Sequence, residues 1–133
     1  MLASVLEVMR SLIELDVSFN DVHAVGARHL ADALKFNETL LYLNLGGNHV
    51  QDQGCGDLAE SLKSNETMTT LILAANDLTT SSCYYWLDCL QVNRVSNKKT
   101  ITTYIVDIVV AVAAERKEIE ESLYCFIVRA PHR

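Results

Sequence analysis

Basic residues are in short supply in this chain. Eleven Lys and Arg stand against 17 Asp and Glu, the formal net charge is -6, and basic clusters such as Lys98-Lys99 are no longer than two residues. Affinity for nucleic-acid phosphates depends on clustered Lys and Arg. The composition therefore argues against nucleic acid as a partner.

Long hydrophobic runs are also missing. The longest candidate, 101–114, is interrupted by Asp107 and is shorter than the ~20 residues that a membrane-spanning helix needs. Near the start, Glu7 stands where a signal peptide requires an apolar run, and no basic residue precedes it. We therefore expect a cytoplasmic protein with no membrane partner.

The chain also lacks a recognisable catalytic or metal-binding set. It has four cysteines but no C-x-x-C pair, and Cys83 and Cys89 have no histidine nearby to complete a zinc site. The histidines show no recognisable spacing to a serine or cysteine nucleophile, whereas catalysis needs nucleophile, base and orienting group together. We expect no enzyme activity, no metal and no cofactor.

What the sequence does contain is one motif repeated three times at a spacing of 28 residues. The copies begin at Leu12, Leu40 and Met68, and each reads apolar-x-x-apolar-x-apolar-x-x-Asn. A fixed period in this range is typical of a solenoid, in which a supersecondary unit buries its apolar face by stacking on its copies. The length of 133 residues suits one domain.

Aligned copies show what each position of the repeat requires. Apolar residues alternate with variable ones in each block, which predicts short half-buried strands lying side by side in a parallel sheet. An asparagine then follows, at Asn20, Asn48 and Asn76. Its amide can both donate to and accept from backbone groups where the chain leaves the sheet.

A helical pattern completes each copy. Leu-Ala with a second leucine four positions after the first, as in Leu30-Ala31 and Leu34, gives one buried helical face. Asp52 and Thr80 are good candidates for helix N-caps. We expect the helices to end at Asn37, Asn65 and Asn93, because asparagine tolerates the left-handed conformation on which helices often stop.

The arrangement of strand, asparagine turn and helix resembles the ribonuclease-inhibitor-like leucine-rich repeat, whose pattern is L-x-x-L-x-L-x-x-N-x-[IVL], then G, L-A-x-x-L and N. Residues 12–93 carry the match. The resemblance implies an α/β leucine-rich-repeat solenoid with a short parallel β-sheet on the concave side and α-helices on the convex side. It also implies a protein-binding role, since members of this family mostly bind other proteins on the concave strand face.

Both ends depart from the repeat pattern. We expect residues 1–11 to form the helix of a partial repeat, 12–95 three leucine-rich repeats, 96–128 a divergent strand and helix, and 129–133 a tail. Two interpretations of 96–128 stay open. The segment is either the polar-faced cap that solenoids require or sequence foreign to the repeat that is amphipathic by coincidence.

Alignment also explains most cysteines as structural. Cys55 and Cys83 share the position of Ala27, and Cys89 shares that of Ala33. Cysteine at such positions acts as a small apolar filler. A Cys/His hydrolase is a further hypothesis, and it would require an unusually reactive thiol at Cys55 or Cys83.

The concave strand face is the candidate binding site. Its residues alternate with the buried strand positions: Glu14, Asp16, Ser18, Tyr42, Asn44, Thr70 and Ile72. Phe19 and His49 lie at the rim. A tyrosine flanked by acids suits a basic, partly apolar protein segment, because tyrosine is enriched at interface hot spots. A plain solvated strand face is the alternative interpretation.

The sequence therefore predicts a non-catalytic protein-protein interaction or scaffold module. The alternative is a regulatory fragment of a larger leucine-rich-repeat protein, of the NOD-like-receptor-like or GTPase-activating kind. Leu2, Val5 and Leu6 are expected to leave an apolar edge at the first repeat, through which the chain could self-associate.

Overall fold

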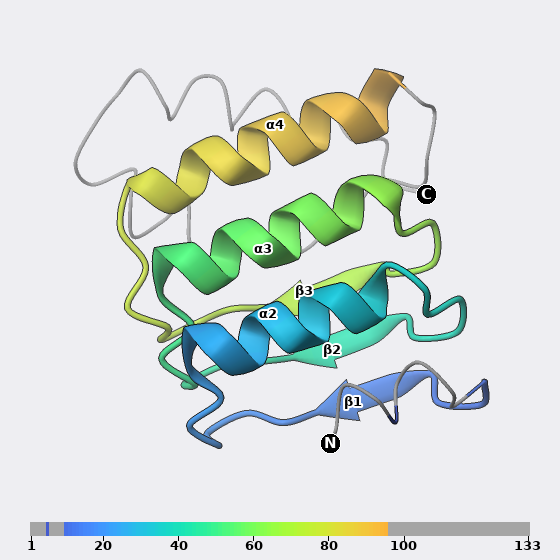
Figure 1. Ribbon diagram of the computed structural model, residues 1–133, viewed down its shortest axis with the longest axis horizontal. Helices are drawn as coiled ribbons and strands as arrows, with labels where there is room; N and C mark the ends of the chain where they lie inside the picture. The colour runs from blue at the N-terminus through green and yellow to red at the C-terminus, as the bar shows by residue number, and fades with distance from the viewer. Residues whose placement is uncertain (1–4, 6–9, 96–133) are drawn as a thin grey trace.

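Strands and helices alternate through the part of the chain that the structure describes. The computed structural model describes residue 5 and residues 10–95 (Figure 1). The elements are β1 (Glu14–Asp16), α2 (His23–Leu34), β2 (Tyr42–Asn44), α3 (Gln51–Ser64), β3 (Thr70–Ile72) and α4 (Ser81–Val95). Each strand and the helix that follows it form one copy of the repeat.

The three strands form a parallel sheet in the order β1-β2-β3. Leu15 pairs with Leu43 and Leu43 with Leu71, so the register equals the spacing of the repeat. The helices lie side by side in one layer, in chain order, and cover one side of the sheet (Figure 1). The predicted α/β leucine-rich-repeat architecture is thereby confirmed.

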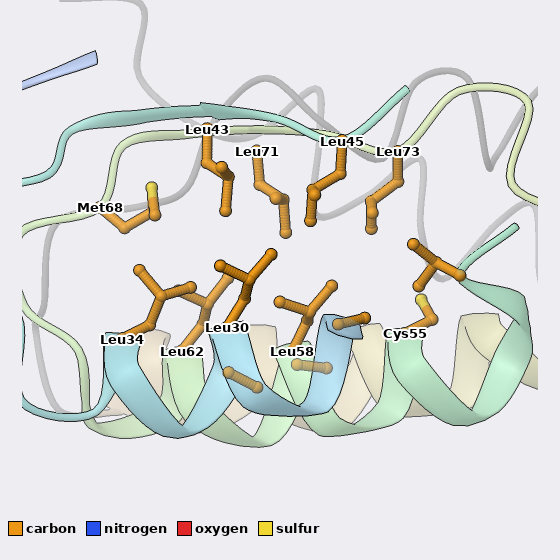
Figure 2. Close-up of a cluster of buried hydrophobic side chains, with 14 of the residues drawn as sticks. Leu30, Leu34, Leu43, Leu45, Cys55, Leu58, Leu62, Met68, Leu71 and Leu73 are labelled. Carbon is orange, nitrogen blue, oxygen red and sulfur yellow. The ribbon is translucent and has the colours of Figure 1, made fainter. Parts of the chain in front are cut away.

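Leucines from the two layers meet in the core. Figure 2 shows Leu43 and Leu71 pointing from the strands toward Leu34 and Leu62 of the helices. These four side chains are completely buried. Full burial of one leucine contributes roughly 1.5–3 kcal/mol, so stacking of the repeats supplies the main driving force for this fold.

The first repeat is less well covered than the second. Leu15 and Val17 are only partly buried, whereas Leu43 and Leu45 at the same positions of the next repeat are completely buried. The cause is the position of β1 at the edge of the sheet. Of the expected helix at 1–11, the structure describes Val5, which is helical, and residues 10 and 11.

Asparagine side chains bind successive repeats together at the end of each strand. The Oδ1 of Asn48 accepts hydrogen bonds from the backbone N–H groups of Asn20 (2.9 Å) and Val22 (3.2 Å) in the preceding repeat. Its Nδ2 donates to the carbonyls of Val17, Leu45 and Gly46. The predicted role of asparagine as both donor and acceptor is confirmed, and the bonds also cross between repeats.

Asn76 repeats this pattern one unit later. Its Oδ1 accepts from the N–H groups of Asn48 (3.0 Å) and Val50 (3.1 Å), and its Nδ2 donates to three carbonyls. Both asparagines are buried. Groups that would otherwise be unpaired inside the protein are therefore satisfied.

A second asparagine position joins the opposite ends of the repeats, and here the sequence prediction was partly wrong. Asn65 follows the end of α3 in an extended conformation (φ -72°, ψ 127°), not a left-handed one. Its Nδ2 donates to the carbonyls of Leu34 (2.7 Å) and Asn37 (3.1 Å) in the preceding repeat. Asparagine is therefore required here for a bridge between repeats. The third helix was expected to end at Asn93, but α4 continues to Val95.

The expected N-cap at Asp52 was also wrong. Helix α3 begins after Val50, which makes no side-chain cap, and Asp52 lies inside the first turn. Its carboxylate instead accepts hydrogen bonds from the backbone N–H of Thr79 (2.8 Å) and from the Thr79 hydroxyl. Asp52 thus links its helix to the following loop, a contact that local propensity could not foresee.

The described residues exclude 1–4, 6–9 and 96–133. The strand and helix expected over 96–128 and the tail expected at 129–133 therefore lie outside them. The two interpretations of 96–128 remain predictions.

The asparagine bridge can be tested by replacing Asn48 with alanine. We expect Asn48→Ala to lower the free energy of unfolding by about 3 kcal/mol, because five backbone groups lose a buried partner. Urea denaturation measures the change. Asn20→Ala is the matched control and should cost less than about 1 kcal/mol, since Asn20 is exposed and bonds only locally. Equal losses in the two variants would contradict the assignment.

Candidate functional site

The outward side of the sheet brings the predicted binding residues together. In register, Glu14 lies beside Tyr42 and Tyr42 beside Thr70, while Asp16, Asn44 and Ile72 form the adjacent row. Ser18 lies two residues after the end of β1. We call these seven residues the strand face. The register thus brings six of the predicted residues together, and their binding of a partner remains a prediction.

Polar side chains of the strand face bind one another. The Oδ1 of Asp16 accepts from the backbone N–H (2.9 Å) and hydroxyl (2.6 Å) of Ser18. Its Oδ2 accepts from the Nδ2 of Asn44 (3.0 Å), whose own Oδ1 accepts from the N–H of Gly46. The Ser18 bonds, with a smaller contribution from Asn44, lower the pKa of Asp16 below its ordinary value. Asp16 is therefore charged and already well supplied with donors.

Other strand-face residues remain more available. Glu14 is exposed and makes no hydrogen bond or ion pair with any residue the structure describes. Tyr42 and Ile72 are half-buried, so each offers part of its apolar surface to solvent. This leaves an acid, an aromatic ring and an aliphatic side chain as the groups that a partner could contact.

Histidines and acids line the rim, where the loops leave the strands. Asp21, His49 and Asp77 occupy the same position of successive repeats. The His49 Nδ1 lies 2.6 Å from an Asp77 oxygen, and its Nε2 lies 3.9 Å from Asp21. The His23 and His49 rings stack with centroids 5.7 Å apart. The hydrogen bond and charge of Asp77, helped by the charge of Asp21, raise the pKa of His49.

Left-handed backbone recurs in these rim loops. Phe19, Gly47 and Ala75 share one position of the repeat, with φ values of 56°, 65° and 53°. Phe19 is 82% exposed, and its ring lies so close to Gly47 that a side chain there would collide with it. The loop conformation is thus a property of the repeat, although only one of these three positions has the glycine that favours it.

The three cysteines of the repeats fill the core, as predicted. Cys55, Cys83 and Cys89 are buried and are not joined in disulfides, and the Nε1 of Trp86 donates to the Cys55 sulfur at 2.9 Å. Burial raises the pKa of Cys55 to about 12. A thiol with this pKa is protonated at neutral pH and is a poor nucleophile.

Sequence reasoning missed the acid-histidine-acid row at the rim and the second asparagine bridge. The 28-residue alignment contained a signal for both, because Asp21, His49 and Asp77 align with one another, as do Asn37 and Asn65.

Among the residues that the structure describes, no three His, Cys, Asp or Glu are grouped so that they could hold a metal ion. None of the described helices is long and apolar enough to cross a membrane.

The His49–Asp77 pair predicts that the stability of the folded protein depends on pH. A raised histidine pKa means that the stabilisation from the pair is fully present below the ordinary value of 6.5 and is lost as the pH rises through the raised pKa. An NMR titration of the His49 ring should give a midpoint above 6.5. Asp77→Asn should lower this midpoint and Asp57→Asn, on α3, should not. An unchanged midpoint in Asp77→Asn would refute the coupling.

Comparison with known proteins supports the repeat. A family model described as "Leucine Rich repeat" matches residues 8–31 and 36–59. Among solved structures, "Leiomodin-1 Actin-Binding Site 2 (ABS2)" is similar, with a TM-score of 0.73 and 17% identity over 96% of this chain and 68% of that one. A search of curated proteins gave no match. At this identity the structural likeness concerns the fold. The chain therefore carries leucine-rich repeats and has the leucine-rich-repeat fold.

Proposed function

We propose that this protein is a non-catalytic interaction or scaffold module that binds a protein partner through the strand face, the concave side in the family it resembles. The observation that carries the proposal is the register of β1, β2 and β3, which gathers six side chains of the strand face on one outward surface. Leucine-rich-repeat domains generally mediate protein-protein interaction, which supports this role.

The chemistry of the strand face favours a basic, partly apolar partner segment. Glu14 and Asp16 place negative charge at the β1 side, and Tyr42 and Ile72 offer apolar surface nearby. Aromatic side chains in the middle of a surface, with charged residues around them, are typical of binding hot spots. Opposite charge on the partner would also speed its association.

Two further features belong to this proposal. The 28-residue unit, with a full helix in each copy, favours the ribonuclease-inhibitor-like type of repeat. A cytoplasmic location fits buried cysteines such as Cys55 and Cys83 that are not joined in a disulfide, because disulfides are rare in reducing compartments. The similar solved structure is an actin-binding site, so purified actin is a reasonable first probe among candidate partners.

The alternative is a regulatory part of a larger leucine-rich-repeat protein. A GTPase activator of that kind would need a catalytic arginine in a loop between strand and helix. The segments 21–25 and 49–53, which run from each loop into the start of its helix, contain none. Stimulation of GTP hydrolysis by this chain would favour the alternative over a pure binding module.

A pair of surface variants tests the proposed face. Glu14→Lys with Tyr42→Ala should weaken partner capture from cell extract, and any direct binding to actin, at least tenfold, which corresponds to about 1.4 kcal/mol. Glu14 is preferable to Asp16 as the site of charge reversal, because Asp16 supports the Ser18 backbone. Quantitative mass spectrometry of the captured proteins measures the effect.

The matched control makes the same two types of substitution, Glu→Lys and Tyr→Ala, at positions outside the strand face. Glu38→Lys with Tyr84→Ala changes an exposed loop acid and an exposed tyrosine of α4. It should leave capture unchanged. If both double variants capture the same proteins as the original chain, the strand face is not the binding surface.

A further inference from the structure

The outer edge of β1 offers a row of backbone acceptors. In the next repeat, the carbonyls of Asn44, Gly46 and Asn48 accept hydrogen bonds from N–H groups of the repeat before, at 3.0, 2.8 and 2.8 Å. In the first repeat these positions are held by Asp16, Ser18 and Asn20. No described residue donates a backbone N–H to their carbonyls, because β1 is the edge strand among the residues described.

Backbone donors lie on the same edge. The N–H groups of Tyr42 and Thr70 donate toward the preceding strand, to the carbonyls of Ile13 (3.1 Å) and Leu41 (2.8 Å). Glu14 occupies the same position of the first repeat, so its N–H points away from β2. The outer side of β1 therefore presents both backbone N–H and backbone C=O groups to which another strand could form hydrogen bonds.

The side chain of Asn20 adds a further acceptor. Asn48 and Asn76 each use Oδ1 to accept two N–H groups from the preceding repeat. Asn20 donates through Nδ2 to Val17 and Ser18, but its Oδ1 accepts from no described residue. The edge therefore has more acceptors than donors, which favours a partner rich in donors, such as one with lysine or arginine.

Apolar surface lies along the same strand. Ile13 is 46% exposed and Phe19 is 82% exposed, while Leu15 and Val17 are only partly buried. An extended segment lying along β1 would cover part of this surface. Contact with alternate apolar side chains of such a segment would add to the backbone hydrogen bonds.

The charge on this edge selects among possible occupants. Glu14, Asp16 and Asp21 are acidic, and residues 11–27 contain no lysine or arginine. Antiparallel pairing of β1 with β1 of a second copy, centred on Leu15, would place Glu14 opposite Asp16 twice. Like charges directly opposite one another are destabilising. Of the two occupants, a basic segment of another protein fits this edge better than a second copy.

We propose that the outer edge of β1, the edge strand of the described sheet, binds a basic, extended segment of a partner protein by β-strand addition. Backbone hydrogen bonds to Glu14, Asp16 and Ser18 hold the segment, and the three acids select its charge. This interaction differs from the proposed strand-face binding, because it depends on the backbone of β1 and requires no side chain of β2 or β3.

The test uses a capped eight-residue peptide of alternating lysine and valine, with the same peptide N-methylated on alternate backbone nitrogens as its control. We expect the unmodified peptide to bind the full chain, and N-methylation to weaken binding at least tenfold by removing its donors. A glutamate-valine peptide should not bind. Two-dimensional NMR should place the shift changes at residues 13–20.

Hydrogen exchange supplies a comparison within the molecule. In the free protein the Glu14 amide should exchange at least tenfold faster than those of Tyr42 and Thr70, its counterparts in the next two repeats. Addition of the unmodified peptide should slow exchange at Glu14 and leave the other two unchanged. Glu14→Lys should weaken peptide binding, and Glu38→Lys should not.

Five outcomes would overturn the proposal. The N-methylated peptide could bind as tightly as the unmodified one, or the shifts could fall on Tyr42 and Thr70, which would place binding on the strand face alone. Slow exchange at Glu14 in the free monomer would show that the chain's own residues cover the edge. Concentration-dependent protection of Glu14 would identify a second copy as the occupant. Tyr42→Ala alone should leave peptide binding unchanged, because edge binding requires no side chain of β2; a loss of peptide binding in this variant would point to the strand face instead.

Discussion

The structure depends above all on hydrogen bonds from buried asparagines to the backbone of the preceding repeat. Asn48 and Asn76 each satisfy five backbone groups at the point where the chain turns out of the sheet. Without them, stacked repeats would bury unpaired polar groups, and this penalty would offset much of the gain from leucine burial. The asparagines also support a loop that holds non-glycine residues, such as Ala75, in left-handed conformations.

Much of this fold could be predicted from the sequence because every position is sampled three times. The alternation around Leu15, Leu43 and Leu71 predicted strand, register and buried face together. The end of α3 was harder, since Asn65 was interpreted from its conformational tolerance alone. Its actual role depends on the carbonyls of Leu34 and Asn37 lying within reach, and such distances become known only when the repeats are stacked.

The candidate site was predictable as a set of positions but not as a chemical surface. Alternation correctly placed Asp16 and Asn44 on the outward side of the sheet. It could not show that Asp16 uses its carboxylate on Ser18 and Asn44, which leaves Glu14 as the acid with unoccupied oxygens among the described strand-face residues. Likewise, His49 was placed at the rim, but its pairing with Asp77 depends on the loop geometry.

The bridges of Asn48 and Asn76 also constrain how this chain could change in evolution. Each bridge joins a side chain to backbone groups 28 and 26 residues earlier. Duplication or loss of a whole unit preserves every such pairing, because each copy carries the donors that its successor requires. An insertion of a few residues between strand and helix would shift the partners of one asparagine out of reach. Gene rearrangement could therefore lengthen or shorten this array in whole repeats, while small insertions would be tolerated only outside the bridged loops.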